Sequence, residues 1–173
     1  MLKKLRNYLN SLVFYKLEKR LKVILPQLIE NDEKIVRSIF SPINLSKDLT
    51  TLKSNAFKPP ADLDEISVNR LNYTTSHYCK SISKSIENLF NDRKYFGLAL
   101  LYASKIREYN ADVIYTPKEN NIFHADIKIG YCVIKGVQLP AEIQYKVNNL
   151  TKAAKLFKDP NPNSNVWEGI EVE

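Results

Sequence analysis

The hydrophobic residues at the start of the chain recur at spacings of three to five, which is the period of an amphipathic helix. Lysines and arginines fall mostly between them. Pro26 is expected to end this helix near Ile24, and a second short helical piece is expected over residues 27–38. The apolar positions are Leu2, Leu5, Leu9, Leu12, Leu17, Leu21, Ile24 and Leu28.

Residues 41–73 never sustain a helical period and contain prolines at positions 42, 59 and 60. The pattern predicts a long ordered loop with a short strand at residues 66–68. Helical spacing returns at Tyr78, Ile82, Ile86 and Phe90, with a Ser or Thr at 74–76 as the N-cap. Gly97 is expected to end that helix.

Strand patterns follow over residues 98–106 and 111–117, and over 124–136 for a third and a possible fourth strand. A helix is predicted over 140–159, with Pro140 in its first turn. Together these elements predict an α+β fold, in which a basic amphipathic helix and a long ordered loop precede a small, mainly antiparallel sheet with flanking helices. The predicted regions are a helical segment (1–38), an α+β domain (39–158) and an extended C-terminal tail (159–173).

Composition is that of an ordinary globular protein, with 173 residues, 44% hydrophobic and 26% charged. This length suits one compact domain. The two cysteines, Cys79 and Cys132, are far apart in sequence, so a reducing, cytoplasmic location is expected. Charged residues at 16, 18, 19, 20 and 22 interrupt the N-terminal apolar pattern, so neither a signal peptide nor a transmembrane helix is predicted.

Positive charge is concentrated at the N-terminus. The formal net charge is +7, and residues 1–30 contribute +5 of it. Such a segment can contact nucleic acid, a protein partner or, through residues 1–25, an anionic membrane surface. Packing on the chain's own domain is the structural alternative. The candidate contact residues are Lys16, Lys19, Arg20 and Lys22.

The sequence lacks GxxxxGK[ST], GxGxxG, HExxH and GxSxG motifs, so phosphate-loop, dinucleotide, zincin and hydrolase-elbow functions are not supported. Two isolated histidines provide no zinc-binding pattern. No metal and no cofactor are therefore predicted.

Three fragments supply candidate chemistry: "IVRSIF", "DEISVNR" and "IFHADI". Arg37 and Arg70 could form an anion-binding pocket with Ser67 and His124, because a guanidinium matches phosphate or carboxylate geometry. His124 and Asp126 are catalytic candidates, since alternate strand residues share a face and imidazole can transfer protons near neutral pH. Structural roles, with the arginines bonded to carbonyls, are the competing interpretation.

The early arginine, "AFKP", "SVNR" and "HADI" together resemble a small, poorly characterised prokaryotic family with AFxP, SVxR and HAxI motifs. The resemblance covers residues 35–130. It departs where Pro117 lies seven residues before His124, because the family pattern has a proline-containing turn directly before the histidine. Such proteins are found beside mobile-element and phage-defence genes, so the resemblance implies a cellular setting rather than a reaction.

The leading hypothesis is an accessory or binding protein of a multi-component prokaryotic system, with defence as the expected setting, that recognises a phosphate-bearing ligand, nucleic acid or partner protein. The alternative is a small enzyme acting on a nucleotide or RNA through an Arg/His/Asp pocket, so enzymatic activity is left open. Convergence of the candidate side chains in an open pocket would favour the enzyme. Candidate side chains that are dispersed, or buried and bonded to carbonyls, would favour the accessory or binding protein.

Overall fold

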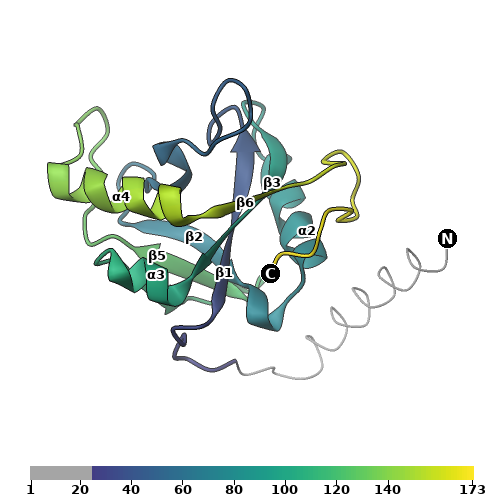
Figure 1. Ribbon diagram of the computed structural model, residues 1–173, viewed down its shortest axis with the longest axis horizontal. Coiled ribbons are helices and arrows are strands. Elements are labelled where there is room, and N and C mark those ends of the chain that lie inside the picture. Colours follow the sequence, from purple (N-terminus) through teal and green to yellow (C-terminus); the bar gives the residue numbers. More distant parts are fainter. Residues whose placement is uncertain (1–24) are drawn as a thin grey trace.

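The computed structural model describes residues 25–173, which form a six-stranded antiparallel sheet with three α-helices (Figure 1). The predicted basic helix lies outside the described residues, as do Lys16, Lys19, Arg20 and Lys22. The strands are β1 (Lys34–Ser41), β2 (Glu65–Arg70), β3 (Lys94–Tyr102), β4 (Asp112–Tyr115), β5 (His124–Lys128) and β6 (Lys155–Lys158). The helices are α2 (Ser76–Glu87), α3 (Ala103–Glu108) and α4 (Ala141–Ala153), with 3-10 turns η1 (Ser54–Phe57) and η2 (Leu71–Tyr73).

The strand order is β4-β5-β2-β1-β3-β6. Each face of the sheet has its own hydrophobic cluster. One joins β1 through Ile35 and Ile39 to α3, α4 and η1, and the other joins Val36 and Phe40 to α2 and the C-terminal segment. The predicted α+β class and antiparallel sheet are confirmed. No helix within residues 25–173 is long and apolar enough to cross a membrane.

The prediction of a helix over residues 27–38 is wrong. Strand β1 begins at Lys34, and residues 25–33 are not helical. The sequence KIVRSIFS places apolar pairs on both sides of "RS". In a strand, alternate residues point to opposite faces, so such pairs supply one residue to each hydrophobic cluster. A strand buried on both faces loses the simple alternation that would have revealed it.

β1 and β2 pair over only a short stretch. Their register is Ile35 with Arg70 and Val36 with Asn69. In contrast, β1 pairs with β3 from Lys34 to Ser41. The two strands therefore stop pairing beyond Val36, and the carbonyls of β2 that face β1 need other donors.

The helix expected to run to Gly97 ends at Glu87, and Gly97 lies inside β3. Its N-cap is Thr75, within the predicted range 74–76, and the Thr75 side chain accepts a hydrogen bond from the backbone N–H of Tyr78. A Cβ on Gly97 would collide with the Phe157 carbonyl. The missing side chain thus permits β6 to approach β3 rather than ending a helix.

The apolar stripe of α2 is not its buried face. Tyr78, Ile82 and Ile86 are only partly buried, and Phe90, beyond the helix, is exposed. The buried side of the helix is instead mostly polar, with Cys79 as its one member of the hydrophobic cluster. Its residues are Ser76, Cys79, Lys80, Ser83 and Glu87.

Other boundaries also differ from the predictions. The strand expected over 98–106 becomes α3 at Ala103, and the possible fourth strand within 124–136 is absent from the described residues because β5 ends at Lys128. The helix expected to reach residue 159 ends at Ala153, after which β6 pairs with β3.

The C-terminal segment after β6 contains no helix or strand, yet it is docked on the domain. Trp167 and Val172 are buried in the same cluster as Cys79 of α2. Lys80 Nζ lies 2.7 Å from Asp159 Oδ2, and both side chains are fully buried. The same ammonium donates to the carbonyls of Asn161 and Val166. This cation therefore joins three points of the segment, at residues 159, 161 and 166, to α2.

Lys80→Met should destabilise the domain by about 3–5 kcal/mol, because it leaves the buried Asp159 carboxylate without its partner. Chemical denaturation would measure this loss. Lys152→Met, at an exposed position in α4, is the matched control and should change stability little. Equal denaturation midpoints for the two variants would show that the buried pair does not hold the segment.

Candidate functional site

The candidate residues lie on three adjacent strands. Arg37 is in β1, Ser67 and Arg70 are in β2, and His124 and Asp126 are in β5. Ser67 is directly opposite Asp126 in the register of β2 and β5. Arg70 faces the other side of the sheet, since it pairs with Ile35 of the α4-side cluster.

Thr116, in the loop between β4 and β5, fixes the orientation of His124. The His124 Nδ1 atom lies 2.8 Å from the Thr116 carbonyl oxygen and 3.0 Å from Thr116 Oγ1. The Thr116 hydroxyl donates to Asp126 Oδ2 at 2.6 Å. A carbonyl can only accept, so Nδ1 carries the hydrogen and Nε2 carries the lone pair of the neutral ring. Burial lowers the pKa of His124, which favours this neutral form.

Two buried acceptor atoms face each other in this cluster. His124 Nε2 and Asp126 Oδ1 are 3.7 Å apart, and each side chain is 6% exposed. Neither atom has a hydrogen-bond partner among the described residues. The predicted sharing of one face by the two side chains is observed, but they are buried rather than pointing outward. Two acceptors suit a hydrogen-bond donor or a cation and repel an anion.

Arg37 occupies the place where β1 and β2 stop pairing. Its Nη1 donates to the Ser67 carbonyl at 2.9 Å, which satisfies a β2 acceptor that β1 no longer reaches. Burial lowers the pKa of Arg37 to about 10, and attraction to Asp126 partly opposes this effect. The guanidinium therefore remains charged at neutral pH, while its Nε has no partner among residues 25–173.

Arg70 is fully buried and is bonded entirely to other parts of the domain. Its Nε and Nη2 donate to Glu33 at 2.9 and 2.6 Å. Nη1 and Nη2 also donate to the carbonyls of Pro26 and Leu28. The guanidinium carbon lies 4.7 Å from the Tyr73 ring centroid and 4.9 Å from that of Tyr115. Four of its five N–H groups thus have partners inside the domain, and the side chain is fully buried.

Sequence reasoning missed Thr116 and Glu33, which position His124 and Arg70. Thr116 could have been found from the β4–β5 hairpin register, which pairs Tyr115 with Ala125. The next pair in this register, toward the turn between the two strands, is Thr116 and His124. Glu33 lies 37 residues from its arginine, and no local pattern links them.

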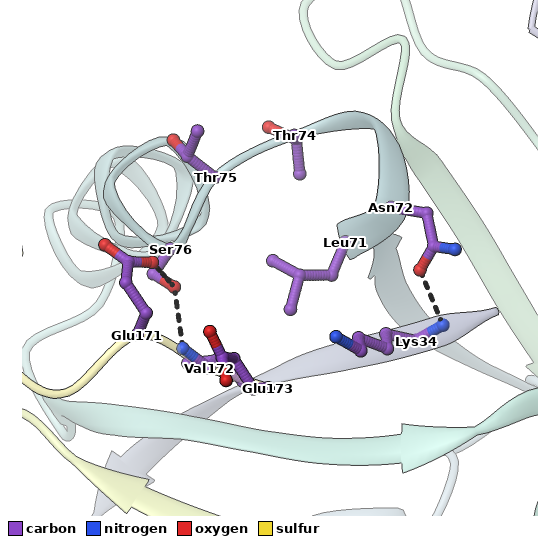
Figure 2. A pocket seen from close by; sticks show the side chains of 9 residues that line it. All are labelled: Lys34, Leu71, Asn72, Thr74, Thr75, Ser76, Glu171, Val172 and Glu173. Carbon is purple, nitrogen blue, oxygen red and sulfur yellow. Dashed lines mark hydrogen bonds between the residues drawn. The ribbon is translucent and has the colours of Figure 1, made fainter.

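A separate cavity of about 340 Å³ lies between the start of α2 and the C-terminus. Figure 2 shows Ser76 bonded to Glu171 and to the backbone of Val172 within its lining. Its lining combines hydroxyls and carboxylates with one ammonium, from Lys34. None of the predicted site residues lines this cavity.

Comparisons with protein-family models, with curated proteins and with solved structures found no match. Residues 25–173 also contain no cluster of three or more His, Cys, Asp or Glu that could hold a metal ion.

Arg70→Lys should lower the free energy of unfolding by about 1.5–3 kcal/mol, because an ammonium cannot reproduce the paired bonds to Glu33. A thermal or urea melt would measure the effect. Arg93→Lys is the control, since Arg93 pairs with Asp92 at the surface. Unchanged stability of Arg70→Lys would contradict the structural role of this arginine.

Proposed function

We propose that this chain is an accessory binding protein of a multi-component prokaryotic system, and that its basic N-terminal segment contacts nucleic acid. The observation that carries the proposal is that the candidate side chains are buried or bonded to other groups of the domain. Arg70 is bonded to Glu33 and two carbonyls, and Arg37 to the Ser67 carbonyl. His124 and Asp126 are buried. Burial of this kind favours a structural role for the two arginines over a substrate pocket.

The distribution of charge supports the same function. Residues 25–173 hold nineteen Lys and Arg against eighteen Asp and Glu, so the domain is almost neutral. Residues 1–24 carry the remaining six of the seven net positive charges. Attraction to phosphates is therefore expected from this segment rather than from the sheet. The prokaryotic, defence-related setting rests on the motif resemblance alone.

Changing Lys16, Lys19, Arg20 and Lys22 together to glutamine should weaken binding to single-stranded RNA and to duplex DNA. Each lost phosphate contact should also reduce the slope of log affinity against log salt by about 0.7 for a single strand and 0.9 for a duplex. Fluorescence anisotropy of labelled oligonucleotides over a salt series would measure both quantities in the full chain.

The matched control removes four charges from exposed lysines of the described domain: Lys47, Lys118, Lys135 and Lys152. This control should retain the affinity and the salt slope. Equal losses in the two variants would indicate a non-specific charge effect. Absence of binding by the wild-type chain would exclude nucleic acid as the ligand, and copurification from the host would then test for a protein partner.

An enzymatic function remains a second candidate because of one observation. The neutral His124 ring presents an unshared Nε2 lone pair beside the Asp126 carboxylate. A base in that state can accept a proton from a hydroxyl. If it acts on RNA or nucleotides, cleavage of labelled RNA or hydrolysis of a nucleotide should disappear in His124→Gln. Turnover that survives this substitution would remove His124 from the reaction.

A further inference from the structure

We propose that His124 Nε2 and Asp126 Oδ1 form a two-ligand binding site for a divalent transition-metal ion of the zinc class. The proposal is independent of nucleic-acid binding by residues 1–24. His124 Nε2 and Asp126 Oδ1 are acceptor atoms that lie 3.7 Å apart, and neither has a hydrogen-bond partner among residues 25–173. Two ligands bound tetrahedrally to zinc at about 2.0–2.2 Å lie roughly 3.4 Å apart. A closure of a few tenths of an ångström would bring both atoms into coordination.

The contacts behind the two atoms match those that orient metal ligands. A metal-bound histidine commonly donates its other ring N–H to a carbonyl, and a bound carboxylate is itself hydrogen-bonded. Here His124 Nδ1 meets the Thr116 carbonyl, and Asp126 Oδ2 accepts from the Thr116 hydroxyl. One residue thus contacts both ligands, and their remaining atoms, His124 Nε2 and Asp126 Oδ1, lie 3.7 Å apart.

Ligand chemistry selects the class of ion. An imidazole nitrogen paired with a carboxylate favours zinc, cobalt or nickel over magnesium and calcium, which prefer oxygen ligands alone. Arg37 also attracts Asp126.

The site is completed from outside the protein. Within residues 25–173 no third His, Cys, Asp or Glu belongs to the cluster. The other coordination positions would therefore be taken by water or by a group of a bound ligand. Ser67, opposite Asp126 in the register, is exposed, so the protein surface begins one strand away from the two buried ligand atoms.

The test is calorimetric titration of the metal-free, full-length chain with zinc chloride at pH 7. Cys132→Ser is used as the background, because Cys132 is an exposed thiol that could bind zinc. One zinc ion per chain is expected. Binding should be lost in His124→Ala and Asp126→Asn, whereas Thr116→Val should weaken it by about 10–100-fold.

His77→Ala and Asp92→Asn are the matched controls and should bind like the background protein. Nitrogen NMR of the intact chain provides a readout that needs no variant at His124. Zinc should shift the Nε2 resonance of His124 and leave that of His77 in place. The site would be excluded by a chain that binds no zinc, by full binding in His124→Ala and Asp126→Asn, or by an unmoved His124 resonance.

Discussion

The buried ion pair between Arg70 and Glu33 is the interaction on which the arrangement of the sheet depends. It connects the end of β2 to the segment that leads into β1, and carbonyls of Pro26 and Leu28 complete its bonding. Removing a guanidinium from water costs several kcal/mol, so its position is fixed by the acceptors that surround it. The start of the β1–β2 pairing at Ile35 and Arg70 follows from this connection.

The end of that pairing determines the candidate site. Because β1 and β2 pair no further than Val36 and Asn69, Arg37 bonds the Ser67 carbonyl in place of a backbone N–H. Attraction to Asp126, which lies on β5 beyond β2, partly opposes the lowering of the Arg37 pKa by burial. One arginine therefore takes the place of the backbone donor that β1 no longer supplies to β2.

Polar contacts organise the opposite face of the sheet as well. Helix α2 turns Lys80 and Ser83 inward, where they meet Asp159 and Ser38. The cost of burying these groups is offset because each has a partner. As a result, the apolar side chains of α2, including Ile82 and Ile86, are left on its flank and only partly buried.

The sequence by itself determined the α+β class, the antiparallel sheet, a helix N-cap within residues 74–76 and the sharing of a face by His124 and Asp126. These features follow from local periodicity and side-chain chemistry. It could not show that 34–41 is a strand buried on both faces, since such a strand lacks alternation. Tertiary structure alone decided the role of Arg70, which looked like a ligand-binding residue. Its partner Glu33 is 37 residues away, and only folding brings the two charges together. The inward orientation of Lys80 also depends on a partner distant in sequence, because Asp159 lies beyond the last helix of the described domain.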